Sequence, residues 1–208
     1  MKVWRWSGML MWLLLPVLAS GQEFNLSPTY AGEAAALRVR PWGGEPATFA
    51  DTGPAPEMGG ERQNSAPAAY PAAGIAAHEL YAVTLGVSGQ NKSQSSLTLL
   101  DATIGSHRIT ALWIEAQAKA SAGFLSVPTS GKCTFAGLTV DGHLVAITGQ
   151  PNQTITFPDG FLVINEQTGS SSAHFGTLTV NALHLQITGV GSLIAASAKA
   201  EVINGPTR

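Results

Sequence analysis

The chain has 208 residues, of which 45% are apolar and only 12% are charged, so it can bury a core but offers few charges for long surface helices. We therefore expect one domain of packed β-structure. The formal net charge is -2, and loss of Lys2 and Arg5 with an expected leader lowers it from -2 to -4. The sequence shows no basic patch to neutralise a phosphate backbone, which argues against nucleic acid as a partner.

Residues 1–21 have the pattern of a signal peptide. Lys2 and Arg5 form a positive start, Met9–Leu18 an apolar core, and Ala19-Ser20-Gly21 a small-residue cleavage site before Gln22. A core of about ten residues is too short to span a bilayer, although an uncleaved anchor is the alternative. No later apolar run is long enough for a membrane span, so we expect a protein that is secreted or held at the cell surface.

Residues 22–78 are predicted to form a low-complexity arm or linker. Pro, Gly and Ala with isolated charges fill Pro41 to His78, and such a segment buries too little apolar surface to offset its ordering entropy. Within this range, Tyr30–Val39 fits either a short strand or a helix. The folded β-domain is expected to span residues 79–204.

Alternation of apolar and polar residues predicts strands at Tyr81–Ser88, Leu97–Ile104, Thr177–Thr188 and Ser192–Ile203, the last with Ile194 and Ala196 on one face. His107–Ala122 is ambiguous because Glu115 and Lys119 have helical i,i+4 spacing. Its apolar residues, from Leu112 onward, nevertheless follow a two-residue period. This period favours a long strand over a helix.

Two turn sequences organise the second half of the chain. Asp141-Gly142 lies between alternating runs and predicts a two-residue type I′ hairpin, in which both residues need positive φ. Phe157-Pro158-Asp159-Gly160 predicts a second turn, with Gly160 free to take the left-handed conformation. Folding there sets Ile155 and Phe157 beside Phe161 and Val163, with Phe161–Ile164 as a central strand.

These elements predict an all-β fold, an antiparallel sandwich or roll of about eight to nine strands. The alternative is a short β-solenoid. It rests on an internal echo in which LTLLDA at Leu97, GLTVDG at Gly137 and TLTVNA at Thr177 recur about forty residues apart.

The order of these segments resembles a known family. GLTVDG, ITGQPNQTITFPDGFLVINEQ, LTVNALHLQI and a closing Ala-rich strand, preceded by FADTGPAP and Gly59-Gly60, are similar to the choice-of-anchor P domain of exported bacterial proteins. The resemblance spans Phe49 to Val202. It implies a surface or secreted domain of unknown molecular role, without catalytic residues, whose members use differing C-terminal anchors. Because the sequence stops at Arg208 without a sorting signal, release or non-covalent retention is expected here.

Glu166 is the best-placed carboxylate for chemistry, since it ends a strand that is otherwise apolar. The competing interpretation is a hydrogen-bonding latch in which Asn165, Glu166 and Gln167 satisfy exposed loop amides. If these residues meet Asn152 and Gln153 in space, the two ends form either the latch that closes the fold or a polar site. Asp141 and Asp159 are explained as turn residues.

Two other features bear on function. Trp113, with Asn152 and Gln153, could form a glycan-binding surface, although the favoured interpretation is that Trp113 covers a second layer or packs under the linker. Cys133, the single cysteine, is interpreted as a small buried hydrophobe, with intermolecular pairing or catalysis as alternatives. The five histidines show no metal-binding spacing, and neither a metal nor a cofactor is expected.

The sequence thus predicts a non-catalytic secreted or cell-surface β-domain with a structural or adhesive role. Expected partners are a cell-envelope polysaccharide or another surface protein. A glycan-binding module is the first alternative, and a secreted hydrolase that uses Glu166 is the second.

Overall fold

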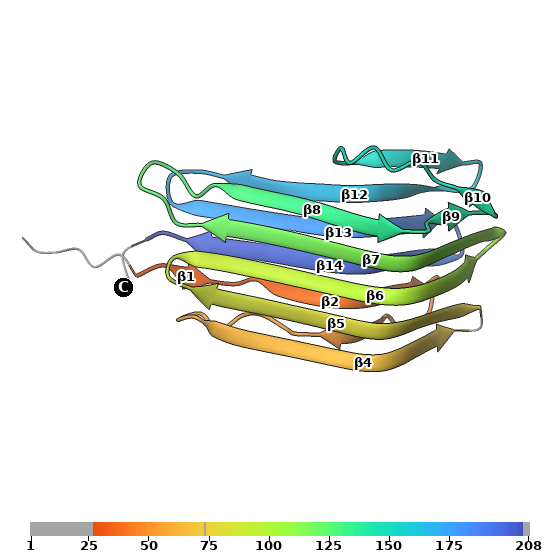
Figure 1. Cartoon of the computed structure of the whole chain (residues 1–208), viewed down its shortest axis with the longest axis horizontal. Helices are drawn as coiled ribbons and strands as arrows, with labels where there is room; N and C mark the ends of the chain where they lie inside the picture. The colour runs from red at the N-terminus through yellow and green to blue at the C-terminus, as the bar shows by residue number, and fades with distance from the viewer. Residues whose placement is uncertain (1–26, 73, 206–208) are drawn as a thin grey trace, which may run out of the picture.

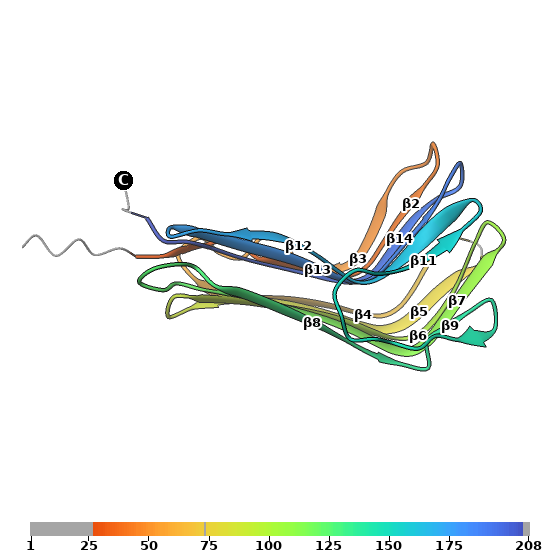
Figure 2. The ribbon, with the colours of Figure 1, turned by 90° about the horizontal axis from the view of Figure 1, so that it is seen from above.

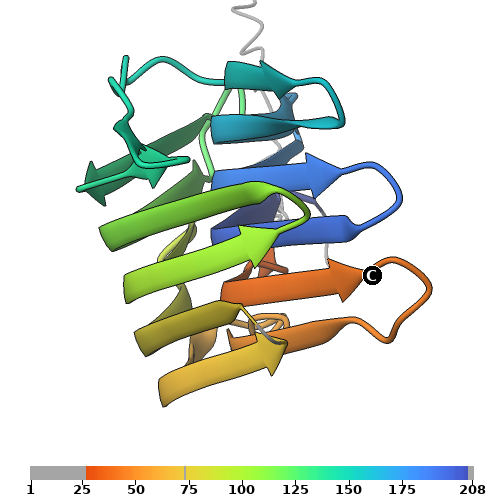
Figure 3. The same ribbon diagram turned by 90° about the vertical axis from the view of Figure 1, so that its right-hand side faces the viewer.

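The computed structural model describes residues 27–72 and 74–205, and these form two antiparallel sheets packed face to face (Figures 1 and 3). The first sheet contains β1 (Thr29–Tyr30), β2 (Glu33–Pro41), β3 (Ala47–Asp51), β11 (Gln153–Phe157), β12 (Gly160–Ser171), β13 (Phe175–Ile187) and β14 (Gly191–Ile203). Its order is β11-β12-β13-β14-β2-β3, and β1 also pairs with β14. We call it the β14 sheet.

The second sheet contains β4 (Gly60–Ala72), β5 (Ile75–Val87), β6 (Gln90–Ile104), β7 (His107–Ser121), β8 (Thr129–Ala136), β9 (Thr139–Val140) and β10 (His143–Leu144). Its order is β10-β9-β7-β6-β5-β4, with β8 also paired to β7. We call it the β7 sheet. The core lies between the two sheets and consists mainly of Leu, Ile, Val and Ala side chains.

The predicted sandwich is confirmed, but the described residues form fourteen strands rather than eight or nine. The solenoid alternative is wrong, because the three echoing segments lie on β6, around β9 and on β13, which belong to both sheets instead of stacking as successive turns. His107–Ala122 and Ser192–Ile203 are strands, as the two-residue period indicated.

The arm predicted over residues 22–78 is wrong for its described part. That range supplies β1 to β4 and the first residues of β5, and Ala35, Ala36 and Leu37 of β2 are fully buried. The expected boundary at Glu79 therefore falls inside β5. The predicted signal peptide, residues 1–21, lies outside the described residues.

Both sheets bend together at one transverse position (Figure 2). At this position each long strand changes which of its alternate residues face the core. On β7, for example, Ile109 and Ala111 face inward before the bend and Ile114 and Ala116 after it, so that Leu112 is 62% exposed. Leu112 was expected to share a face with Ile114 and Ala116. That expectation is wrong, because it assumed an unbroken two-residue period.

Residues with positive φ mark the bend. They are Ala50, Glu79, Leu99, Gly137, Asn165 and Ala196, with φ of 49°, 46°, 47°, 64°, 55° and 55°, and we call them the bend line. A left-handed residue rotates the strand about its axis, so two consecutive side chains point to the same face and the alternation shifts by one residue. On β14, Leu193 and Ala195 therefore face inward before Ala196, and Ala198 and Ala200 after it, so Ile194 does not share a face with Ala196 as expected.

The two predicted turns form. Asp141 and Gly142 have φ of 51° and 79° and join β9 to β10, which confirms the type I′ hairpin. In the second turn, Phe157 pairs with Gly160, so Ile155 lies opposite Leu162 and not beside Phe161 as expected.

The role predicted for Gly160 is also wrong, since it has no positive φ. A Cβ there would lie 2.0 Å from the Gln186 carbonyl oxygen, so the glycine permits close approach of β13. As predicted, Phe161–Ile164 is a central segment, flanked by β11 and β13.

Candidate functional site

The two amide-rich ends identified in the sequence meet in space. The backbone N–H of Asn152 donates to the Asn165 carbonyl at 2.8 Å, and the backbone N–H of Gln167 donates to Oδ1 of Asn152 at 2.9 Å. Asn152 and Asn165 both have positive φ, a conformation that Asn tolerates better than most residues. We call Asn152, Asn165 and Gln167 the amide latch.

The latch also joins the two sheets. Nε2 of Gln167 donates to Oδ1 of Asn165 at 2.9 Å and to the Gly131 carbonyl on β8 at 3.3 Å. The Cys133 thiol, on the same strand, donates to Oδ1 of Asn165 at 3.2 Å. These bonds close the edge of the sandwich where β12 of one sheet faces β8 of the other. Asn165 is 5% exposed, so its amide is satisfied internally and not by solvent.

Gln153 holds the loop before β11. Its Oε1 accepts from the backbone N–H and hydroxyl of Thr148 at 2.9 and 3.0 Å, and its Nε2 donates to the Ala146 carbonyl at 2.8 Å. Its amide is therefore engaged in fixing residues 146–150 and is not directed at a ligand.

Glu166 lies beside the latch and pairs with β13. The Nδ1 atom of His184 lies 3.1 Å from both carboxylate oxygens, and Nδ2 of Asn181 donates to Oε2 at 2.6 Å. The hydrogen bond from His184, and then that from Asn181, lowers the pKa of Glu166 against the opposing effect of burial. Glu166 is thus held as a carboxylate.

This cluster lacks a nucleophile. A His–carboxylate pair performs acyl transfer when the second ring nitrogen contacts a hydroxyl or thiol. Within residues 27–72 and 74–205, no Ser, Thr or Cys hydrogen bonds to His184, and the edge of its ring meets Phe161 at a centroid distance of 6.1 Å. Oδ1 of Asn181 is buried without a hydrogen-bond partner. The contacts of Glu166 fix the orientation of His184 and Asn181 on β13.

Trp113 is separate from the amides with which the sequence grouped it. It is half-buried on β7, where it pairs with Thr98 and Ala136, whereas Asn152 precedes β11 in the other sheet. No hydrogen bond among the described side chains joins Trp113 to Asn152 or Gln153. The geometry therefore gives no support to one glycan surface built from these three residues.

Burial determines the chemistry of Cys133. Desolvation, followed by the negative charge of Glu115, raises the pKa of its thiol to about 12. Because the thiolate is the nucleophilic form, this thiol is unreactive near neutral pH. The interpretation of Cys133 as a small packing residue fits this environment.

The sequence did not reveal a second polar cluster, which surrounds His107. Its Nδ1 lies 2.8 Å from Oδ2 of Asp141 and its Nε2 lies 2.9 Å from Oδ1 of Asp159. Phe157 stacks on the imidazole at a centroid distance of 4.0 Å. Because His107 belongs to the β7 sheet and Asp159 to a turn of the β14 sheet, the contact between them ties the two sheets together at one end. We call His107, Asp141 and Asp159 the His107 clasp.

Within the clasp, His107 and Asp141 each shift the pKa of the other. The hydrogen bond to Asp141 is the largest influence raising the pKa of His107, and that same bond lowers the pKa of Asp141. Asp141 and Asp159 are turn residues as predicted. Their contacts with His107 could not be predicted, because nothing in the sequence shows that positions 107, 141 and 159 lie together.

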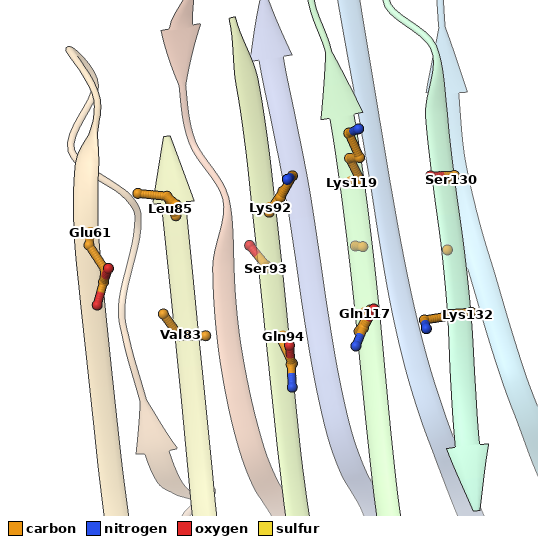
Figure 4. A pocket seen from close by; sticks show the side chains of 12 residues that line it. Glu61, Val83, Leu85, Lys92, Ser93, Gln94, Gln117, Lys119, Ser130 and Lys132 are labelled. Carbon is orange, nitrogen blue, oxygen red and sulfur yellow. The ribbon is translucent and has the colours of Figure 1, made fainter. Parts of the chain in front are cut away.

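A groove on the outer face of the β7 sheet was also missed (Figure 4). It brings together Lys92, Lys119 and Lys132 from three neighbouring strands. The sequence did not reveal this cluster of three lysines, because they are far apart in the chain and adjacent only in the sheet.

Two further properties concern the described residues only. No group of three His, Cys, Asp or Glu side chains among them is arranged to hold a metal ion. Nor do residues 27–72 and 74–205 contain a helix long and apolar enough to cross a membrane.

Compared with known proteins, the chain matches no family model, no curated protein sequence and no solved structure.

Proposed function

We propose that the chain is a non-catalytic β-domain, secreted or displayed at the cell surface, with a structural or adhesive role. The observation that carries the proposal is that the polar residues considered for chemistry form hydrogen bonds within the protein itself. The side chains of the amide latch and of Gln153 form hydrogen bonds that hold strands and loops together. A catalytic site keeps such groups free for a substrate.

Three further arguments support this function. The export pattern of residues 1–21 directs the chain outward, and the resemblance to the choice-of-anchor P domain suggests a bacterial cell envelope as its destination. The extended sandwich also offers broad sheet faces, which suit contact with a polymer or another surface. The proposed partner is a cell-envelope polysaccharide or another surface protein.

Co-sedimentation tests this function. The chain beginning at Gln22 is incubated with isolated bacterial cell walls and, separately, with fluorogenic glycoside, ester and peptide substrates. We expect the protein to sediment with the walls and to turn over none of the substrates. Turnover that disappears in Glu166→Gln, with an unchanged circular dichroism spectrum, would show a hydrolase instead. A protein that stays in the supernatant would contradict the adhesive role.

A further inference from the structure

The groove on the outer face of the β7 sheet has the size of a ligand site. Its volume is about 490 Å³, within the range of pockets that bind small molecules or polymer segments. Strands β4 to β8 form its floor, as Figure 4 shows. The inward side chains of the same strands belong to the core, so the groove lies on a rigid support.

Three lysine side chains line this groove, as Figure 4 shows. The register places Lys92 directly opposite Lys119, where facing Cβ atoms lie about 5 Å apart. Lys132 lies opposite Gln117, which makes it a diagonal neighbour of Lys119 at about 7–8 Å. Among the ion pairs of the described residues, none involves these three lysines.

This arrangement is unfavourable without a ligand. Like charges directly opposite each other on paired strands destabilise the sheet. Lys92 and Lys119 carry such a repulsion, and Lys132 adds to it. An anion bound between them would relieve the repulsion, so the groove is prepared for negative charge.

The rest of the lining suits a sugar chain. Nε2 of Gln94 and Nε2 of Gln117 both donate to the Glu115 carboxylate, at 3.3 and 2.6 Å, which fixes the two amides. Their carbonyl oxygens have no partner among the described side chains and can accept hydroxyl groups. Val83 and Leu85 add an apolar strip along one side, against which the C–H face of a sugar ring can pack.

The same lining disfavours nucleic acid. None of the described residues that line the groove is aromatic, so bases have no stacking platform. Glu61 in the lining and Glu115 beside it would also repel a densely charged phosphate backbone.

We propose that this groove binds an extended polysaccharide that carries carboxylate groups, with Lys92, Lys119 and Lys132 contacting the carboxylates and Gln94 and Gln117 the hydroxyls. The inference rests on the proposed adhesive function and gives it a ligand class and a surface.

Two variants with the same net charge test this site. Lys92→Gln/Lys119→Gln removes two charges from the groove, and Arg40→Gln/Arg62→Gln removes two charges from residues outside its lining. Binding to polygalacturonate is measured by biolayer interferometry, with fully methyl-esterified polygalacturonate as the uncharged probe. We expect the unaltered chain and the arginine variant to bind only the charged polymer. The lysine variant should bind about tenfold more weakly.

Other outcomes of these measurements would contradict the proposed binding site. Equal weakening in both variants would show attraction by net charge alone, and binding to both polymers would show that carboxylates are not recognised. Tighter binding to single-stranded DNA or to inorganic polyphosphate than to polygalacturonate would assign the groove to phosphate. Absence of binding to polygalacturonate would also reject it.

The cell-wall assay separates this proposal from the broader one. If the unaltered chain and the lysine variant sediment equally with cell walls, the groove is not the contact surface but the adhesive role stands. If neither sediments while both variants and the unaltered chain fold, the adhesive role itself fails. Circular dichroism and thermal unfolding of all three proteins establish the folding.

Discussion

The imidazole of His107 in the β7 sheet lies 2.9 Å from the carboxylate of Asp159 in a turn of the β14 sheet. The second ring nitrogen lies 2.8 Å from Asp141. The contact with Asp159 joins the sheets at the end of the sandwich where β6 turns into β7 and β11 turns into β12 (Figure 1). Its strength depends on pH, because it needs a protonated imidazole and ionised carboxylates.

The sign of that dependence follows from the direction of the pKa shifts. The raised pKa of His107 gives stability that is complete below its unfolded value, about 6.5, and lost as pH rises through the folded value. The lowered pKa of Asp141 gives stability that is present above its unfolded value and lost as pH falls through the folded one. We therefore expect His107→Gln to lower Tm by a few degrees more at pH 5.5 than at pH 9.

Differential scanning calorimetry at the two pH values measures this effect. His174→Gln is the control, since His174 is exposed just before β13 and its Nδ1 lies 3.1 Å from the Asn204 carbonyl oxygen instead of a carboxylate. Its Tm should follow that of the unaltered chain at both pH values. An equal loss of Tm in His107→Gln at pH 5.5 and pH 9 would mean that only packing on Phe157 was removed.

The bend line predicts a stabilising substitution. Leu99 has φ of 47° and is 55% exposed. Its left-handed backbone is strained, and burial of its side chain does little to offset that strain. Asn tolerates this conformation, as Asn165 does on β12. Leu99→Asn should therefore raise the free energy of unfolding by up to about 1 kcal/mol.

Leu112 provides the matched control. It is similarly exposed and lies beside Leu99 in the register, but its φ is not positive. Leu112→Asn should lower the free energy of unfolding, because Asn is a poor strand residue. Urea unfolding of both variants gives the comparison, and the idea of strain at Leu99 is rejected if both substitutions destabilise equally.

The amide latch predicts the reactivity of Cys133. With its thiol pKa raised to about 12, Cys133 should not react with 5,5′-dithiobis(2-nitrobenzoate) at pH 8 in the folded chain. Asn165→Gly preserves the left-handed backbone but removes the amide that joins β12 to β8. We expect this variant to react measurably faster, because the sheet edge opens.

Asn64→Ser serves as the comparison for that experiment, since Asn64 lies on β4 at the opposite edge of the sandwich. Its thiol reactivity should equal that of the unaltered chain. Rapid reaction in the unaltered chain would contradict the burial of Cys133.

The strands β1 to β4 predict that the β-domain cannot begin at residue 79. A chain of residues 79–208 lacks these strands and the start of β5, which exposes the edge of β14 and the core around it. We expect it to show no cooperative thermal transition, whereas the chain that begins at Gln22 should show one. A cooperative transition in the shorter chain, followed by far-UV circular dichroism, would restore the idea of an independent arm.

The sequence predicted the strands that combine apolar alternation with clear turn residues. His107–Ala122 and the Asp141-Gly142 hairpin are examples, because local pattern and local backbone preference agree there. It failed on β4, whose Pro67 and Pro71 favoured a linker. β4 is an edge strand, where a missing N–H need not interrupt a ladder, so proline is tolerated.

The candidate site divides in the same way. The latch could be anticipated, because Asn152 and Asn165 lie at the two ends of one hairpin and meet through local folding. The His107 clasp and the lysine groove could not, because their members come from turns and strands whose adjacency depends on sheet order. Sheet order is set by long-range packing, which one sequence does not display.

The bend line also limits how this chain can change in length. Every long strand reverses its inward set of residues at the same level, so adjacent strands stay matched on both sides of the bend. A residue deleted from β6 near Leu99 would shift one half of that strand by one position and turn its core leucines toward water. A single gap therefore cannot be absorbed locally. Sequences that share this architecture should keep their strand lengths on either side of the bend and place insertions in the turns.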